Sequence, residues 1–360
     1  MSKVLVDCYI NDNFGDDLFL HMLCNRYKNT KFYTIARKQN KKMFESLRNL
    51  KYLSFDKTLI NHLSLTNYYK KQLRRKVNKS VDAHITIGGS LFAERHDEFI
   101  NNLEYNKFLS KIVKNKKNYL IGCNFGEYSS PKFYDNYLSV FSMYDNICFR
   151  DKYSYNLFKD SLNNVSFAPD VAFQFEYPLK NIKDNNYILI SIIDLESRVT
   201  IQEHKFEYIR LIVSYIKKYI NQNYKIALFS ACHPEHDTRA IEKIKSQLSE
   251  EEQQMLQVHV HNNLDQSIKL IAESSAVIST RLHVTILALL FSKKTLPLIY
   301  DNKIINLLED MDYNNPYIDI RELKSLDNAD QYEPMKFKIS KEIRKNSEKQ
   351  FAELDSILLS

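Results

Sequence analysis

The chain has 360 residues, which is too long for one ordinary hydrophobic core and suits two domains of about 150–180 residues each. With 44% hydrophobic and 26% charged residues, its composition is that of an ordinary globular protein. Its best apolar run, Val284–Phe291, is far shorter than the ~18 apolar residues of a membrane-spanning helix, which excludes an integral membrane protein of that kind.

Five cysteines are scattered along the chain without a CxxC pair. An odd and scattered set argues against a disulfide framework and against a structural zinc site. The N-terminal apolar stretch is interrupted at Asp7 and follows a single Lys, which is typical of a strand and not of a secretion signal. These features together predict a cytoplasmic protein.

The formal net charge of +7 is concentrated in two short segments. Their basic residues are Lys70, Lys71, Arg74, Arg75, Lys76 and Lys79 in the first, and Lys111, Lys114, Lys116 and Lys117 in the second. Two solvated helix faces would explain both. Alternatively, they attract anionic lipid at the inner face of the membrane or a lipid-linked phosphorylated acceptor, since each basic residue contributes about 1 kcal/mol near such a surface. Nucleic acid is not expected as a partner, because no motif for it is present.

In chain order, the first half alternates short β-rich segments with amphipathic helical stretches. The expected strands occupy residues 3–10, 31–36, 52–55, 83–89, 118–123, 146–149 and 165–168. Apolar strands that alternate with helices predict a parallel sheet covered on both faces.

Residues 174–186 are polar, include Pro178 and lack periodicity, so we place a domain boundary there. The alternation then resumes, with strands expected at 187–193, 224–231, 256–260, 276–279 and 295–300 and helices near 202–221, 237–248, 264–273, 281–291 and 302–310. The prediction is an α/β chain of two Rossmann-like, doubly wound domains, 1–178 and 179–330, with a helix near 339–358 within residues 331–360 that packs back on the first domain. Because ligands bind beyond the carboxyl ends of parallel strands, we expect the active site in a cleft between the two domains.

All five glycines lie at or just beyond the carboxyl ends of predicted strands in the first domain: Gly15, Gly88, Gly89, Gly122 and Gly126. Glycine permits positive φ and a close approach of backbone to ligand. Each loop alone would fit an ordinary tight turn, but three such loops at one sheet edge indicate a binding wall. The second domain makes its turns without glycine, which favours the binding interpretation. None of the loops is a GxGxxG motif or a P-loop.

Arg150 leaves the sixth predicted strand where the next helix begins, and its planar guanidinium suits a carboxylate or phosphate. A surface arginine paired with a nearby acid is the alternative interpretation. Asp170, which follows Pro169, is either a turn former or a site residue.

In the second domain, segment 276–291 (AVISTRLHVTILALLF) places a buried strand directly before an apolar helix. Arg281 and His283 open this helix, where positive charge opposes the helix dipole. Their position is explained if an anion binds there to the helix amides, the guanidinium and the imidazole. A buried histidine beside an ion-paired arginine is the alternative. Lys303, at the start of the next helix, would add a second positive charge.

The order of motifs NFGDD, IGGS, IGCNFGE, FRDKYS, APDVAF, STRLH and PLIYDNK resembles the polysaccharide pyruvyltransferase family over roughly residues 11–310. The resemblance implies a glycosyltransferase-B-like pair of domains and transfer of the enolpyruvyl unit of phosphoenolpyruvate to a sugar, usually as a cyclic ketal. It also places Arg150, Arg281 and His283 where phosphoenolpyruvate is handled. The chain departs from the family at GGS, where many members carry a third glycine.

The chemistry fits these residues, because phosphoenolpyruvate carries a carboxylate and a phosphate that need cations. A proton delivered to its methylene carbon creates an oxocarbenium-like centre, and His283, with a reference pKa of about 6.5, is the expected general acid. Glu94 is a further candidate for acceptor binding or base catalysis. The candidate substrate-binding residues are Gly15, Asp16, Asp17, Gly88, Gly89, Ser90, Asn124, Glu127, Ser279, Thr280 and Lys303.

Phosphoenolpyruvate is expected as co-substrate, with no other cofactor and no metal. Cys232, His233 and His236 lack an evident fourth zinc ligand. The acceptor would be a capsular, exopolysaccharide or cell-wall glycan or its lipid-linked precursor. Two alternatives stay open: a nucleotide-sugar glycosyltransferase of the same architecture, and a catalytically inert scaffold that binds membrane surfaces.

Overall fold

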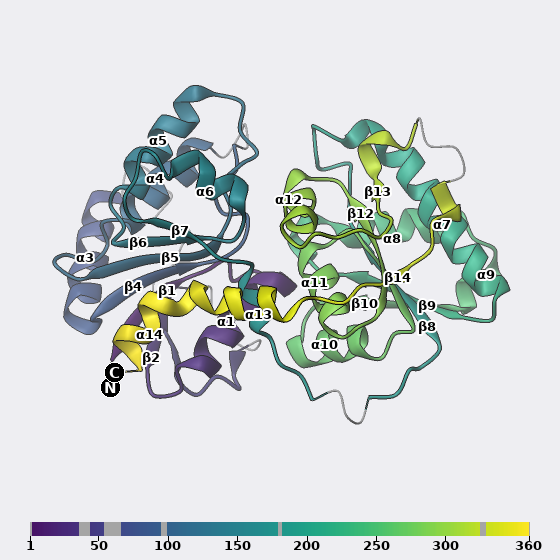
Figure 1. Ribbon diagram of the computed structural model, residues 1–360, viewed down its shortest axis with the longest axis horizontal. Helices are drawn as coiled ribbons and strands as arrows, with labels where there is room; N and C mark the ends of the chain where they lie inside the picture. The colour runs from purple at the N-terminus through teal and green to yellow at the C-terminus, as the bar shows by residue number, and fades with distance from the viewer. Residues whose placement is uncertain are drawn as a thin grey trace. The chain divides into compact units, whose positions relative to one another are not determined.

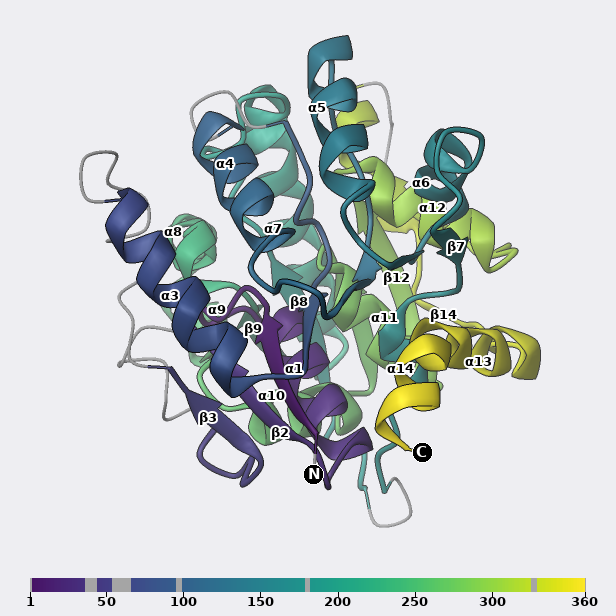
Figure 2. The ribbon, with the colours of Figure 1, turned by 90° about the vertical axis from the view of Figure 1, so that its left-hand side faces the viewer.

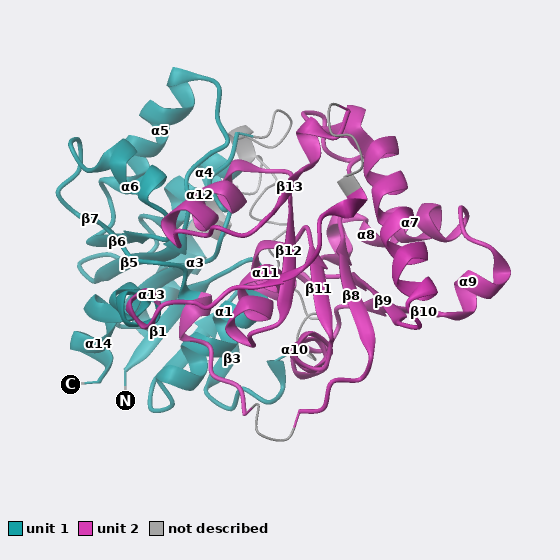
Figure 3. Ribbon diagram, turned by 45° about the vertical axis from the view of Figure 1, so that its right-hand side comes forward, with its two compact units in different colours: residues 1–10, 16–171, 344–360 teal, residues 11–15, 172–343 magenta. Residues whose placement is uncertain are grey.

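The computed structural model describes residues 2–35, 44–53, 66–94, 99–178, 182–324 and 329–359, without the side chains of 66–70 and 99–101. It divides into two compact units (Figure 3). Unit 1 comprises residues 1–10, 16–171 and 344–360, and unit 2 comprises residues 11–15 and 172–343. Residues 36 and 54–55 of the expected strands and the Lys70 side chain lie outside the described residues.

Unit 1 contains a seven-stranded sheet in which all neighbouring strands are parallel. In spatial order the strands are β3 (Leu50–Tyr52), β2 (Lys31–Thr34), β1 (Lys3–Asp7), β4 (Ala83–Ile87), β5 (Lys117–Cys123), β6 (Asn146–Phe149) and β7 (Val165–Phe167). All five residues of the central strand β4 are buried, as a strand covered on both faces requires.

Helices cover both faces of this sheet (Figures 1 and 2). The connection through α1 (Phe14–Arg26) runs from β1 towards β2, whereas α3 (Thr66–Ser80), α4 (Phe99–Leu109), α5 (Pro131–Phe141) and α6 (Lys152–Phe158) connect strands in the opposite direction. Because such crossovers are right-handed, α1 lies on one face and the other four helices lie on the other. The 3₁₀ turn η2 (Val171–Gln174) leads out of the unit.

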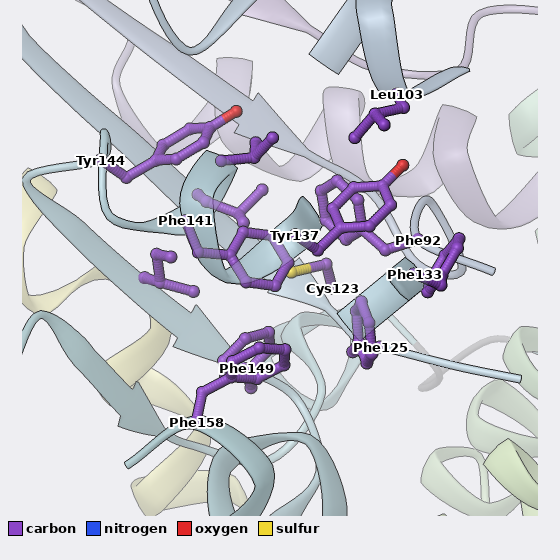
Figure 4. Packing of buried hydrophobic residues seen from close by; sticks show 13 residues of the cluster. Phe92, Leu103, Cys123, Phe125, Phe133, Tyr137, Phe141, Tyr144, Phe149 and Phe158 are labelled. Carbon is purple, nitrogen blue, oxygen red and sulfur yellow. The ribbon is translucent and has the colours of Figure 1, made fainter. Parts of the chain in front are cut away.

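An aromatic cluster beneath α5 fixes two of the loops at the carboxyl edge of the sheet (Figure 4). Phe92 follows the β4 loop and Phe125 follows β5, and both are fully buried against Tyr137 and Phe141. The two loops are also joined by a hydrogen bond of 2.8 Å from the Gly126 amide to the Phe92 carbonyl. Packing of large rings therefore limits the movement of the polar residues between them.

The C-terminal residues return to unit 1 on the face that carries α1 (Figure 1). The expected single helix is divided into α13 (Lys341–Ser347), the 3₁₀ turn η8 (Glu348–Phe351) and α14 (Ala352–Leu358). Gln350 accepts a hydrogen bond from the Gly122 amide (3.0 Å) and donates to the carbonyls of Phe149 (3.1 Å) and Ala168 (2.7 Å). One buried side chain thus satisfies backbone groups at the ends of β5, β6 and β7.

Unit 2 contains a second parallel sheet with one antiparallel edge pairing. Its spatial order is β10 (Leu256–Val260), β9 (Lys225–Ser230), β8 (Tyr187–Ile192), β11 (Ala276–Ser279), β12 (Lys294–Ile299) and β13 (Ile318–Asp319), and β14 (Met335–Lys336) pairs antiparallel with β12. One face of the sheet carries α7 (Lys205–Asn221) and α8 (Asp237–Lys245), which contact each other. The helices α10 (Leu264–Ala272) and α11 (Leu282–Leu290) connect strands in the opposite direction along the sheet. Because such crossovers are right-handed, they lie on the other face.

The remaining helices of unit 2 are short or follow the last strands. They are η4 (Gln202–His204), η5 (His233–Glu235), α9 (Glu250–Gln254), α12 (Asn302–Asp310), η6 (Ile320–Glu322) and η7 (Ala329–Gln331). Ser249 caps α9 in a reciprocal capping box with Glu252. Among the described residues, no helix has the length and apolar character that crossing a bilayer requires.

The strand order reverses between β1 and β4 in unit 1 and between β8 and β11 in unit 2. In open α/β sheets, the loops at the carboxyl ends of strands beside such a reversal form ligand sites. The α/β class with two Rossmann-like, doubly wound units is confirmed. The strand expected at 83–89 ends at Ile87, so that Gly88 and Gly89 lie in the loop, and the division between the units falls at residues 171 and 172.

Replacing Gln350 with Leu should lower the free energy of unfolding by about 2–4 kcal/mol, because the Gly122 amide and the Ala168 carbonyl each lose a hydrogen bond and the Phe149 carbonyl keeps its bond from the Ala168 amide but loses the second. Chemical denaturation measures this loss. Gln266, exposed on α10, is the matched control, and its Leu variant should stay within about 0.5 kcal/mol of the original. Equal effects of the two substitutions would contradict the assigned role of Gln350.

Candidate functional site

Arg150 lies at the carboxyl end of β6 and turns inward, with a side chain that is only 4% exposed. Its Nη1 donates to Asp170 at 3.1 Å, and its Nη2 donates to Asn124 Oδ1 at 2.6 Å and Ser90 Oγ at 3.3 Å. Asp170 is fully buried, so its carboxylate balances the guanidinium charge. The sequence leaves Asp170 as either a turn former or a site residue. In the structure it is the ion-pair partner of Arg150.

The position of Arg150 explains the glycine at residue 89. A Cβ atom there would lie 2.8 Å from Nη1 of Arg150, closer than side chains tolerate. Gly122 has φ +74°, a left-handed conformation that favours glycine, and its Cβ would approach Val171 at 3.1 Å. Gly88 is crowded by the flexible Leu91 side chain alone. Close packing around a buried arginine is therefore sufficient to account for Gly89.

The acidic candidates of unit 1 lie in different surroundings. Asp16 and Asp17 are buried in the first turn of α1, where negative charge complements the helix dipole. Glu127 is exposed. Glu94 accepts hydrogen bonds from the amides of Ser129 (2.6 Å) and Ser130 (3.0 Å). Desolvation by itself would raise the pKa of Glu94, but these hydrogen bonds lower it below its ordinary value. Glu94 therefore organises the turn before α5.

Residues 11–15 belong to unit 2, although they precede most of unit 1 in the sequence. The Phe14 amide donates to the Ala231 carbonyl at 3.0 Å, and Asn13 forms an antiparallel bridge with Cys232. The Phe14 ring packs edge-on against Phe229 and His261, with centroids 5.9 and 5.5 Å apart. His261 is thus buried, and its Nδ1 lies 2.8 Å from Ser267 Oγ.

Gly15 lies directly against the imidazole of His283. A Cβ atom on residue 15 would overlap Nδ1 of the ring and would lie 2.5 Å from Cε1 and 2.7 Å from Cγ. Both residues belong to unit 2, and His283 is in the first turn of α11. Glycine is therefore required at position 15 for the imidazole to occupy this place.

Arg281 immediately precedes α11, and its guanidinium is held by two carboxylates of the loop after β9. Nη1 pairs with Glu235 and Nη2 pairs with Asp237, which is fully buried. The Glu235 carboxylate, 27% exposed, also accepts a hydrogen bond of 2.5 Å from Arg198 in the loop after β8. Although burial alone would raise it, Arg281 and Arg198 hold the pKa of Glu235 well below its usual range.

A second cationic pair surrounds the ring of Tyr300 at the end of β12. The Arg198 guanidinium carbon lies 4.8 Å from the ring centroid, and Lys303 Nζ lies 4.9 Å from it. Lys303 also pairs with Asp301 at 2.9 Å. Burial alone would lower the pKa of Lys303, but Asp301 and Tyr300 raise it, so the ammonium stays charged. Arg198, Arg281 and Lys303 thus form one group at the switch point of unit 2.

Ser279 and Thr280 support the end of β11. Both are fully buried; Ser279 Oγ lies 2.9 Å from Ser191 Oγ, and Thr280 Oγ1 donates to the Ser191 carbonyl at 2.8 Å. The N-cap residue Arg281 makes no side-chain hydrogen bond to the amides of the first turn of α11. Ser279 and Thr280 therefore fix the loop that presents these amides, Arg281 and His283.

Sequence reasoning did not include Arg198, Glu235 and Asp237 among the site residues. Arg198 and Glu235 follow the predicted strands 187–193 and 224–231, and Asp237 begins the helix predicted near 237–248. Their positions after strands place them at the carboxyl edge of the sheet, but no sequence motif distinguishes them from other charged residues. In the described residues, no three His, Cys, Asp or Glu side chains are arranged to hold a metal ion.

The fold and both strand-end clusters define a protein with two Rossmann-like domains, the architecture of glycosyltransferase-B enzymes and related epimerases. The family model of polysaccharide pyruvyl transferases matches residues 9–302, and the chain belongs to this family. It is therefore a transferase of the kind that adds pyruvyl groups to polysaccharides. Among curated proteins, none matches the sequence.

Solved structures of similar fold support the architecture alone, because their sequences are distant. A UDP-GlcNAc 2-epimerase from Neisseria meningitidis, bound to UDP-GlcNAc, is 12% identical with a TM-score of 0.64, and 99% of each chain is covered. A UDP-GlcNAc 2-epimerase from Methanocaldococcus jannaschii is 12% identical with a TM-score of 0.58, covering 98% of this chain and 99% of that one. A glycosyltransferase from Rickettsia africae is 12% identical with a TM-score of 0.56, covering 99% and 98%.

The contact between Gly15 and His283 predicts a strong coupling between substitutions at the two positions. Gly15→Ala should destabilise the protein by about 1–3 kcal/mol, because the methyl group displaces the imidazole. In a His283→Ala background the same change should be neutral or stabilise by up to about 1 kcal/mol, as Ala favours helix over Gly. Denaturation of the four proteins measures the coupling; equal costs in both backgrounds would exclude the contact.

Proposed function

We propose that this transferase takes phosphoenolpyruvate as donor and attaches its pyruvyl group as a ketal to a sugar of a capsular, exopolysaccharide or cell-wall glycan or a lipid-linked precursor. The observation that carries the proposal is the group of three cations, Arg198, Arg281 and Lys303, together with His283 and the backbone amides in the first turn of α11. A carboxylate and a phosphate on three carbons need this combination of charge and a proton donor.

In the proposed reaction, His283 gives a proton to the methylene carbon of phosphoenolpyruvate, and the adjacent carbon becomes electron-deficient. A sugar hydroxyl forms a bond to that carbon and loses its proton. The carbon–oxygen bond to phosphate then breaks, and phosphate departs with the electron pair. A second hydroxyl closes the ketal; of the two hydroxyl protons, one restores His283 and the other leaves on phosphate.

The cations take different parts in this proposal. Arg281 is fixed by the fully buried Asp237 and keeps its orientation throughout. Arg198 and Lys303 flank Tyr300 with partly exposed side chains, and they bind the phosphate. Arg150, with its guanidinium engaged by Asp170, Asn124 and Ser90, is a positioning residue that holds the loops of unit 1.

Replacing His283 with Asn should reduce turnover at least ~100-fold and leave the KM for phosphoenolpyruvate nearly unchanged, since general acid catalysis contributes about 10²–10⁴-fold. Phosphate release with a panel of hexosides as acceptors measures both constants. His259→Asn, on the edge strand β10, is the matched control and should keep full turnover. Unchanged turnover in His283→Asn would remove the proposed acid.

Arg198→Gln should weaken phosphoenolpyruvate binding about 10–100-fold, because a charged hydrogen bond to the ligand contributes about 1.5–3 kcal/mol. Calorimetric titration measures this loss against Arg210→Gln, a control on α7 whose arginine is largely exposed and weakly paired. Equal affinities of the two variants would contradict the role of Arg198. Binding of UDP by the unmodified protein without binding of phosphoenolpyruvate would support the glycosyltransferase alternative instead.

A further inference from the structure

The two basic segments of the sequence are adjacent in unit 1. Asn78, near the end of α3, donates from Nδ2 to the Ile112 carbonyl at 2.9 Å and accepts from the Lys114 amide at 2.8 Å. Lys116 crosses back to α3, donating to the carbonyl of Asn78 at 2.5 Å and to that of Val81. The end of α3 and the turn between α4 and β5 are therefore fastened together.

This arrangement produces one basic surface, composed of the exposed side chains of Lys71, Arg75, Lys76, Lys79, Lys111 and Lys114. Lys71, Arg75 and Lys79 are spaced by four residues and share the outward face of α3, opposite the buried Leu73 and Val77. Figure 2 looks onto this helix. The basic surface is thus a consequence of how α3 packs as well as of composition.

Negative charge is missing from both segments. No acidic residue occurs between residues 57 and 81 or between residues 105 and 126. Other basic residues nearby have structural tasks: Lys116 caps α3, Arg74 stacks on Phe108 at 5.0 Å, and Lys117 pairs with Asp145 at 2.9 Å. The favourable interaction of a cation with the helix dipole explains Lys79 in the last turn of α3, but not Arg75 and Lys71, about one and two turns earlier.

The basic surface is separate from the Arg150 cluster. Lys79, Lys111 and Lys114 lie near the amino ends of β4 and β5, which begin at Ala83 and Lys117, and Lys71 and Arg75 continue the surface along the outward face of α3. Gly89, Asn124 and Arg150 instead follow the carboxyl ends of their strands. A large anionic partner on the basic surface would therefore contact α3 and the turn before β5, and not the loops that hold Arg150.

We propose that the basic surface docks the protein on an anionic lipid bilayer. A bilayer fits because the cations come from two segments and are spread over one surface, which suits many phosphate headgroups better than one bound ion. The inference does not depend on the donor or the acceptor of the transfer reaction.

Sedimentation with vesicles tests the proposal, using phosphatidylcholine with 30% phosphatidylglycerol and, for comparison, phosphatidylcholine alone. The protein should bind the anionic vesicles, and 0.5 M salt should release it. The variant Lys71→Gln, Arg75→Gln, Lys79→Gln should bind about 100-fold more weakly, at about fivefold for each lost charge. The variant Lys111→Gln, Lys114→Gln should bind about 25-fold more weakly by the same rule.

The matched control is Lys28→Gln, Lys132→Gln, Lys159→Gln, which removes three exposed charges of unit 1 outside the basic surface. It should bind anionic vesicles nearly as well as the unmodified protein, and all variants should keep their unfolding transitions. An equal loss in the control would assign binding to net charge and overturn the proposal. Binding of single-stranded RNA but not of vesicles would overturn it as well.

Discussion

The pairing of Arg281 with two carboxylates is the constraint on which the site of unit 2 depends. The nearly buried guanidinium of Arg281 needs an anionic partner, because an unpaired buried charge is costly. Asp237 is fully buried and therefore cannot exchange this ion pair for contact with water. Asp237 also accepts a hydrogen bond of 3.2 Å from the Cys232 amide, which fixes the loop after β9. That loop pairs with residues 11–15 and so places Gly15 against the imidazole of His283. The arginine therefore positions the proposed acid through a continuous series of contacts.

Unit 1 also contains an arginine paired with a buried carboxylate, but its surroundings differ from those of Arg281. Arg150 is paired with the buried Asp170, and its remaining bonds go to Asn124 and Ser90 on neighbouring loops. The aromatic cluster around Phe92 and Phe125 holds those loops from the other side. In unit 2, by contrast, Glu235 is partly exposed and is shared between Arg198 and Arg281. In the reaction that we propose, an incoming anion replaces this carboxylate, and unit 2 binds the donor.

The sequence predicted the α/β class and the placement of Arg150, Arg281 and His283 at strand ends, because apolar periodicity locates the ends of buried strands. It could not predict their partners: Asp170, Glu235 and Asp237 are ordinary acids in loops, and only the strand order brings them to the arginines. Residues 11–15 were assigned to the first domain by chain order, whereas their contacts are with the loop after β9. Gly15 and Gly89 were recognised as unusual, but the side chains that exclude a Cβ atom there come from distant segments.

The proposed reaction depends most on the transfer of a proton from His283 to the methylene carbon of phosphoenolpyruvate. Turnover in D₂O followed by mass spectrometry of the pyruvylated sugar tests this step directly, because the carbon-bound deuterium records how the methyl group was formed. We expect one deuteron in each transferred methyl group, and we expect it to appear much more slowly in His283→Asn. A product without carbon-bound deuterium, or one formed equally fast by the variant, would contradict it.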